Sequence, residues 1–325
     1  MVTSTMTSEE VTLHVVETVL AFSSVVLLAV VLKKFKIIGE EDGPLFARLI
    51  THAIAPVVIF SQLATHPVTV RQFSLVLAMI VAGSVCLAAA WAAGRLMRLG
   101  RDKIGALMIT SSFGSSALLG YPIVQFAFSN NPEAMTDAIL VSELGVALPV
   151  FTLCPVIAMY FGQANRDLAA VRKAVLEYFR SPMFMALLLG LVASQVRPPT
   201  DSPIFATFFE ASQMILGALT VLACLVLGVQ LSPKAFRGIV PMLIVSAAIQ
   251  MGLQPWLANV QATLYGLSAE QRQVLVLISS LPSAVLGPVF ATRYQCAGKT
   301  ASSLAVANIL LSVAIVPATF WILIA

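Results

Sequence analysis

Charged residues are scarce in this sequence of 325 residues, where they make up 10% of the chain. Hydrophobic residues make up 59%, and the mean hydropathy is +0.94. A soluble domain carries about a quarter of its residues as charged side chains, so this composition excludes an ordinary soluble domain. It predicts an all-α polytopic membrane protein whose main solvent is the lipid bilayer. The polar first ten residues also lack Lys and Arg, and we expect no signal peptide there because such peptides begin with basic residues.

Motifs for catalysis and metal binding are missing as well. The sequence has no His-Glu-x-x-His, no Gly-x-Ser-x-Gly and no aspartate-rich pair, and its three histidines are scattered. We therefore expect no enzyme, no cofactor and no metal site. The pI near 9 does not indicate a nucleic-acid partner, because the basic residues lie between apolar runs in the pattern that orients membrane proteins. Four cysteines without Cys-x-x-Cys spacing are interpreted as small apolar packing residues: Cys86, Cys154, Cys224 and Cys296.

Apolar segments dominate what is present. A transmembrane helix needs about 20 predominantly apolar residues, and ten segments meet or approach this length, the sixth being short. A polar linker at 163–181 divides them into two halves of five, at 1–162 and 182–325. The ten segments cover residues 12–32, 45–64, 73–97, 104–128, 135–161, 182–196, 205–231, 236–258, 271–295 and 301–324.

Lys and Arg are distributed unevenly among the connecting loops. All but three of the 19 basic residues follow odd-numbered segments, the exceptions being Arg71, Arg197 and Arg272. Because cytoplasmic loops are enriched in Lys and Arg, the odd loops are predicted to be cytoplasmic and both termini extracytoplasmic, in a bacterial inner membrane. Five helices in each half give the halves opposite orientations. The sequence therefore predicts a 5+5 inverted repeat.

The two halves share unusual residues at a single offset of 168 residues. In both halves the match includes an apolar segment that Ser, Gly and Pro interrupt. Such a pair of interrupted segments indicates a secondary transporter whose binding site lies where they meet. The matched residues are Ser111-Ser112 with Ser279-Ser280, Ser115 with Ser283, Leu118 with Leu286, and Gln62 with Gln230.

Segments four and nine are predicted to be broken helices. Proline removes a backbone donor and clashes with the carbonyl one turn earlier, and loose backbone at membrane depth must be buried in protein or line a wet cavity. Two breaks in inverted halves can cross near the midplane and present half-helix N-termini to one volume, which favours an anion such as a carboxylate. The alternative is a pair of ordinary proline kinks. The candidate substrate-binding residues are Ser115, Ser116, Gly120, Tyr121, Pro122, Pro282, Ser283, Gly287 and Pro288.

Ionisable and amide side chains inside apolar segments are costly and are therefore candidate functional residues. Glu143 follows the first break and could carry a coupling proton, help to bind a cation or repel the wrong anion. It could equally lie near the outer end of segment five and face water. Asn308 occupies the equivalent part of segment ten and is a neutral candidate partner. Gln62 and Gln230 either line the cavity or cap the ends of their helices.

Other polar residues in the apolar segments are interpreted as structural. Gln250 and Gln254 in segment eight are expected to form hydrogen bonds between helices, which contribute about 1 kcal/mol each. His14, Glu17 and His52 lie near the predicted interfaces, where side chains reach toward water or bond locally.

Two short motifs at the breaks are similar to those of a known family. Gly120-Tyr121-Pro122 matches a Gly-x-Pro crossover, and Leu281-Pro282 with Val289-Phe290-Ala291 and Tyr294 matches a Leu-Pro … Phe-Ala-x-x-Tyr run. On these motifs, and on length, helix number and orientation, the chain resembles a bacterial member of the auxin efflux carrier family, relatives of the plant PIN exporters. It departs from the family in Ser115-Ser116, where Asn is frequent, and in the placement of Pro288. The long cytoplasmic loop of many plant members is absent.

The resemblance implies a ten-helix fold akin to the bile-acid symporters. A scaffold domain and a transport domain with crossed helices four and nine would move past each other in an elevator-like way, and a homodimer would form through scaffold helices. The implied substrate is a small organic anion, of the malonate or malate type before an auxin-like acid. Coupling to H⁺, coupling to Na⁺ and uniport stay open. The alternatives are a sodium-dependent bile-acid-type symporter, which would need a cage of carboxylates and amides, and a non-transporting receptor on the same fold.

Overall fold

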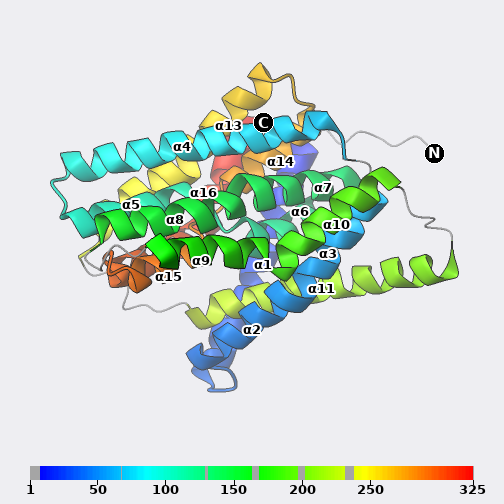
Figure 1. Ribbon diagram of the computed structural model, residues 1–325, viewed down its shortest axis with the longest axis horizontal. Helices are drawn as coiled ribbons and strands as arrows, with labels where there is room; N and C mark the ends of the chain where they lie inside the picture. The colour runs from blue at the N-terminus through cyan, green and yellow to red at the C-terminus, as the bar shows by residue number, and fades with distance from the viewer. Residues whose placement is uncertain are drawn as a thin grey trace.

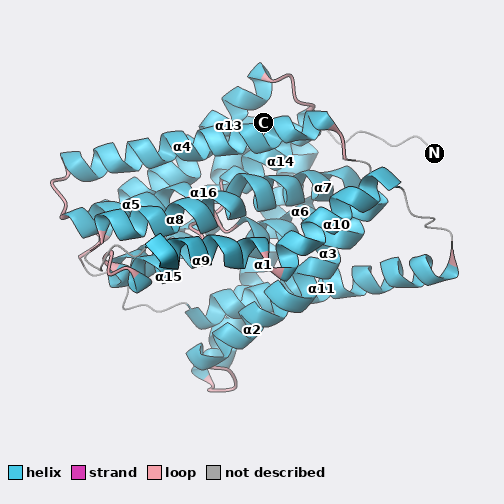
Figure 2. Ribbon diagram, in the orientation of Figure 1, coloured by secondary structure: helices cyan, strands magenta, loops and turns pink. Residues whose placement is uncertain are grey.

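Helices account for all regular elements in the part of the chain that the computed structural model describes, residues 8–66, 68–128, 131–162, 168–196, 202–230 and 238–324 (Figure 2). The α-helices are α1 (Ser8–Lys34), α2 (Gly43–Leu49), α3 (Ala55–Thr65), α4 (Phe73–Leu96), α5 (Arg101–Ser112), α6 (Tyr121–Ala127), α7 (Pro132–Leu140), α8 (Leu148–Phe161), α9 (Leu168–Phe179), α10 (Pro182–Val196), α11 (Pro203–Gln230), α12 (Val240–Ala247), α13 (Gln254–Leu264), α14 (Ala269–Ser279), α15 (Leu286–Arg293) and α16 (Gly298–Ile324). Short 3₁₀ turns are η1 (Glu40–Asp42) and η3 (Val70–Gln72).

Seven helical stretches among the described residues are long and apolar enough to cross a membrane, which confirms a polytopic, all-helical protein. Three of the ten predicted segments, the fourth, sixth and ninth, are not among these seven stretches, and the structure shows why. Segments four and nine are each divided into two helices, and α10 of segment six has only 15 residues. A helix that is broken or short does not by itself reach the length of the hydrocarbon core. The count of ten, the two halves and the inverted repeat therefore remain predictions.

Four π-helical turns among the described residues share a position, each ending two residues before a proline. A proline has no N–H to donate, and its ring clashes with the carbonyl four residues earlier, so a widened turn relieves the conflict without ending the helix. Such turns are frequent at functional sites. They are η2 (Ile50–Ile54) before Pro56, η4 (Ser116–Gly120) before Pro122, η5 (Val141–Ala147) before Pro149, and η7 (Ala248–Leu253) before Pro255.

The helices pack in two groups. In the first, which we call the α11 group, α10 lies along α3, and α11 packs against α1, α2 and α3. In the second, the crossover group, α4 packs on α5 and α13, α8 on α5 and α15, and α16 on α5, α12 and α15. The same group includes α14, which packs on α13 and α7, and α6, which packs on α7 and η4. Figure 1 shows α2, α3, α10 and α11 together on one side of the molecule, with α4, α5 and α8 stacked on the other. The groups meet mainly where α1 contacts α6 and α16.

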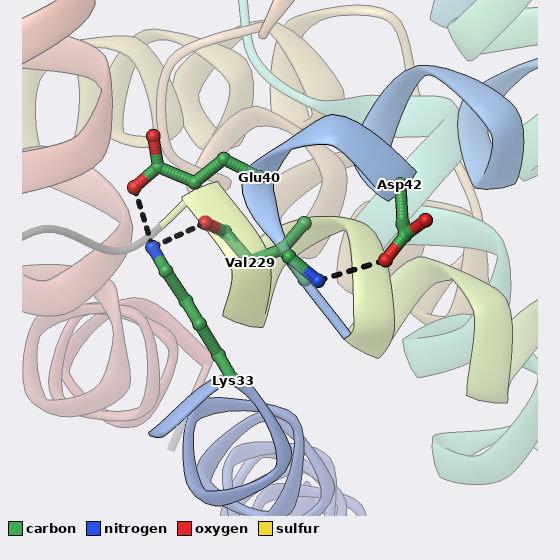
Figure 3. A network of polar contacts seen from close by, with 5 residues as sticks. Lys33, Glu40, Asp42 and Val229 are labelled. Carbon is green, nitrogen blue, oxygen red and sulfur yellow. Dashed lines mark hydrogen bonds and ion pairs between the residues drawn. The ribbon is translucent and has the colours of Figure 1, made fainter. Parts of the chain in front are cut away.

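Lys33 joins the ends of two helices within the α11 group (Figure 3). Its Nζ lies 2.7 Å from Glu40 Oε1 and 2.7 Å from the backbone oxygen of Val229, near the end of α11. The backbone N–H of Gly39 donates to Asp42 Oδ2 and closes the intervening turn. A cation that bonds a carbonyl in the last turn of a helix satisfies an acceptor that has no partner within the helix. This contact holds α1 and α11 together at the end predicted to be cytoplasmic.

The cysteines are buried free thiols, in agreement with their interpretation as packing residues. Cys296, in the loop between α15 and α16, lies near the backbone oxygen of Asp102. Burial raises the pKa of its thiol to about 12, and Asp102 adds to the effect, so the thiol stays neutral.

Candidate functional site

The two broken segments meet at their breaks. Gly114, between α5 and η4, pairs with Ser283, between α14 and α15, in a short antiparallel bridge. The N–H of Ser115 donates to the oxygen of Pro282 at 2.7 Å, and the N–H of Ala284 donates to the oxygen of Phe113 at 2.7 Å. At the offset of 168 residues Ser283 matches Ser115, which is the neighbour of Gly114. The two broken segments therefore cross within one residue of the matched positions. Two ordinary proline kinks, the alternative interpretation, would not be expected to form hydrogen bonds with each other.

Gly114 allows the close approach of the two backbones. A Cβ atom at this position would lie 3.2 Å from the backbone oxygen of Leu281 and 3.2 Å from Nε2 of Gln250. The backbone oxygen of Leu281 accepts a hydrogen bond from Gln250 and would have to shift to admit a Cβ, which favours glycine here. A residue without Cβ is common where two backbones pass closely.

Two glutamines hold the loose backbone around the crossing. Gln250 Nε2 donates to the oxygen of Leu281 at 3.1 Å and to Oε1 of Gln254 at 2.9 Å, while Gln254 Nε2 donates to the oxygen of Ser112 at 3.4 Å. These bonds join η7 and α13 to the ends of α5 and α14, as expected for bonds between helices. Gln250 and Gln254 were not among the predicted site residues, although two glutamines one turn apart in an apolar segment were the available signal.

Asn308 supports the second break. Its Nδ2 donates to Ser246 Oγ and to Ser283 Oγ, both at 2.8 Å. The hydroxyl of Ser283 in turn donates to the backbone oxygen of Thr110, near the end of α5. Asn308 therefore acts on the crossing itself, and both its donors go to serines instead of Glu143. Thr110 and Ser246 were not predicted, because only the packing of α5, α12 and α16 brings them together.

Glu143 is fully buried, so the alternative in which it faces water is wrong. The hydroxyl of Tyr121 donates to Glu143 Oε1 at 2.7 Å, and the hydroxyl of Tyr178 in α9 donates to the backbone oxygen of Glu143 at 2.8 Å. Oε2 has no hydrogen-bond partner among the residues that the structure describes. An ionised carboxylate removed from water without a cation costs several kcal/mol.

Several other buried polar atoms near the crossing also lack partners within the described parts of the chain. Folded proteins leave few such groups, because each costs about 1–3 kcal/mol. Their concentration here indicates a polar layer, inside an otherwise apolar bundle, with capacity for further hydrogen bonds. The atoms are Ser111 Oγ, Ser112 Oγ, Gln250 Oε1 and Asn308 Oδ1.

A cavity of about 260 Å³ lies where the two helix groups meet. One wall comes from α1 and α11, with Val19, Phe22 and Leu227, and the other comes from η4, the second break and α16. Apart from Ser23 and Ser312 its lining side chains are apolar, and none of them is charged. The space is large enough for a small organic molecule, which proteins bind in mostly apolar pockets with few polar groups.

The predicted site residues have different positions relative to this cavity. Pro282 lines it, next to Leu281. Ser115, Ser116, Tyr121 and Pro122 are buried in the first broken segment, and Ser283 and Pro288 in the second.

The two predicted site glycines pack tightly against the opposite segment. A Cβ at Gly120 would lie 2.6 Å from Cδ1 of Ile278, and one at Gly287 would lie 2.6 Å from Cγ2 of Ile109. Gln62 is buried in α3, and the side chain of Gln230 lies outside the described residues.

Paired broken helices inside a bundle of apolar helices, beside a cavity between two helix groups, define a polytopic membrane protein with the architecture of a transporter. A family model described as "Membrane transport protein" matches residues 14–322, and the chain belongs to this family. The match confirms the resemblance to the auxin efflux carriers that the sequence motifs indicated. The protein is thus a membrane transporter.

Two archaeal proteins are similar to the chain over most of their length. An uncharacterized transporter of Methanocaldococcus jannaschii is 24% identical over 312 residues, which cover 94% of this chain and 98% of the relative. An uncharacterized transporter of Methanothermobacter thermautotrophicus is 26% identical over 279 residues, with coverage of 85% and 87%.

Proposed function

We propose that the protein is a secondary carrier of small organic anions that works by elevator-type alternating access. The observation that carries the proposal is the hydrogen-bonded pair of breaks next to a cavity between the two helix groups. Loose backbone at membrane depth in carriers forms substrate sites. The crossover group would carry the substrate, and the α11 group would stay in place as the scaffold.

The character of the boundary supports such a movement. Val19 and Phe22 of α1 face the cavity opposite Leu119 and Val316 of the crossover group. Apolar contacts are non-directional, so two apolar surfaces can slide to a second packing with little loss of specific bonds. The polar bonds at the crossing lie within one group and would move with it as a unit.

The cavity lining also bears on the class of substrate. Malonate and malate carry two charges in a small body, and burial of an uncompensated charge in apolar surroundings is strongly unfavourable. No basic side chain lines this cavity. An acid with one carboxylate and an apolar body, such as indole-3-acetate, would place its charge toward the crossing and its body against α1. The lining therefore favours auxin-like acids over the dicarboxylates that the resemblance ranked first.

Uptake into proteoliposomes tests this proposal. We expect saturable counterflow of indole-3-acetate that is faster than that of malonate or malate. Ser312→Phe should abolish the counterflow, because its ring fills the cavity. Ser302→Phe, on an exposed face of the same helix α16, should leave it unchanged.

Three results would count against the proposal. Unaltered flux in Ser312→Phe would exclude this cavity as the substrate site, and faster dicarboxylate flux would reverse the substrate preference. Ligand-induced thermal stabilisation without flux, at any proton or sodium gradient, would favour a non-transporting receptor.

A further inference from the structure

We propose that Glu143 is a proton-binding site that the first broken segment controls, and that its proton is the coupling ion. The carboxyl holds the proton in the conformation described above and releases it to water when movement of α6 opens the site, because loss of the Tyr121 hydrogen bond alone would favour the protonated form. Its role as a coupling site rests on the proposed function, whereas its role as a proton-binding site does not.

No described side chain supplies a counter-charge to Glu143. Glu143 is fully buried, Oε1 accepts a hydrogen bond from Tyr121, and Oε2 has no partner among the described residues. A neutral carboxyl avoids the cost of a buried charge and needs no cation. An ionised carboxyl would need a partner at Oε2, and no side chain in the described parts of the chain donates to it.

The groups that surround Glu143 do not supply a positive charge. The titratable groups facing it are two phenols, Tyr121 from α6 and Tyr178 from α9. The other elements packed against η5 are α4, α7, α8, α14 and η4. Their ionisable residues are Arg95 and Cys86 in α4, Glu133 and Asp137 in α7, Cys154 and Tyr160 in α8, and Glu270 and Arg272 in α14, with none in η4. The two arginines lie near the far end of α4 and the start of α14. Helix α9 also carries Arg172, Lys173 and Glu177, whose side chains are exposed.

The immediate chemistry favours a proton over a metal cation. One carboxylate oxygen and the neighbouring hydroxyl of Ser142 are the unpartnered polar atoms of this turn. Hard cations take about six oxygen ligands. The described residues contain no group of three or more His, Cys, Asp or Glu side chains that could hold a metal ion. A proton needs one oxygen.

The position of Tyr121 connects the carboxyl to the crossing. Tyr121 follows η4 directly, and η4 starts at Ser116, next to the backbone pair at Ser115. Glu143 is held from the other side, because Tyr178 bonds its backbone oxygen and stacks on Phe151 with ring centroids 4.8 Å apart. A shift of the half-helix against η5 would separate the phenol from Oε1 and open the carboxyl to water, which accepts the proton and solvates the ionised form. The proton affinity of Glu143 therefore depends on the position of the first broken segment.

Infrared spectroscopy of the lipid-reconstituted protein tests the proton site without any substrate. Near neutral pH we expect the carbonyl stretching band of a protonated carboxyl, shifted in D₂O, in the wild type and in Glu133→Gln. Glu133 is an exposed acid of the same apolar stretch and serves as the control. The band should be absent from Glu143→Gln. An identical spectrum in Glu143→Gln near neutral pH would overturn the inference.

Flux measurements test the coupling. With a transported acid, an imposed pH gradient should drive accumulation in the wild type, in Glu133→Gln and, more slowly, in Glu143→Asp. Glu143→Gln should keep counterflow but lose the pH-driven accumulation. Accumulation by Glu143→Gln at the wild-type level, or accumulation driven by Na⁺ instead of pH, would overturn the coupling role. If the wild type moves none of the acids, the proposed function fails, and the infrared band alone decides whether Glu143 holds a proton.

Discussion

The two broken segments contact each other, yet different chemistry holds them. Behind the first break, the hydroxyl of Tyr121 bonds the carboxyl of Glu143. Behind the second, the amide of Asn308 bonds the hydroxyls of Ser246 and Ser283. An amide cannot change its charge near neutral pH, whereas a carboxyl can. The two breaks therefore have different supports: an amide of constant charge lies behind the second, and a carboxyl, which can bind or release a proton, lies behind the first.

The largest effect is expected from Asn308→Leu. The change removes two buried hydrogen bonds at about 1–2 kcal/mol each, so unfolding in detergent should become easier by roughly 2–4 kcal/mol. Glu143→Gln, which is nearly isosteric and keeps an acceptor for Tyr121, should cost less than about 1 kcal/mol. Equal losses in the two variants would contradict the division between a constant and a responsive support.

The next effect concerns the backbone pair at the crossing. Ser115→Pro removes the N–H that bonds Pro282 and leaves a buried acceptor without a partner, at a cost of about 1–3 kcal/mol. Ala284→Pro removes the other N–H, so the two costs should be similar if both bonds hold the crossing equally. Ser115→Ala keeps the N–H and is the control in the same unfolding assay. A loss as large in Ser115→Ala would assign the effect to the side chain.

A smaller effect is expected from Tyr121→Phe. Deletion of the hydroxyl removes one hydrogen bond, which contributes about 0.5–1.5 kcal/mol to stability. The infrared band assigned to Glu143 should shift in frequency, because its carboxyl loses a donor. Tyr178→Phe removes a bond to the backbone oxygen instead, and should leave the frequency unchanged. Equal frequency shifts in both variants would argue against direct control by Tyr121.

The smallest effects are expected from the two predicted site glycines. A Cβ at Gly120 would meet terminal methyls of Ile278 and Leu281, and one at Gly287 would meet a methyl of Ile109. Overpacking opposes the gain of about 0.5–1 kcal/mol from a helical Gly→Ala change, so thermal unfolding should change little in either variant. Gly287→Ala should be the less stable of the two, since Cγ2 of Ile109 is attached to its Cβ, whereas the atoms facing Gly120 are the ends of flexible side chains. The reverse order would show that Ile278 and Leu281 move less easily than Ile109.

Sequence patterns predicted the two breaks that cross, but not the side-chain contacts that hold them in place. Paired Ser/Gly/Pro breaks predicted where the helices end, because proline and glycine act through local backbone sterics. The same patterns left Glu143 undecided between the interior and water, because burial depends on neighbours such as α9. Gln250 and Gln254 were expected to bond between helices, but their partners at Leu281 and Ser112 depend on how η7 and α13 pack. The span count and the inverted repeat stay predictions.

The amino-acid sequence by itself determined that the protein resides in a membrane, that two of its apolar segments break, and which family it resembles. Composition and proline placement carry this information because any chain needs apolar helices to cross lipid, and proline disturbs any helix in the same way. Tertiary structure alone decided that Pro282 lines a cavity with α1, that Asn308 supports Ser283, and that Glu143 lies buried beneath Tyr121. These contacts join residues far apart in sequence, so only the packing of whole helices brings their side chains together.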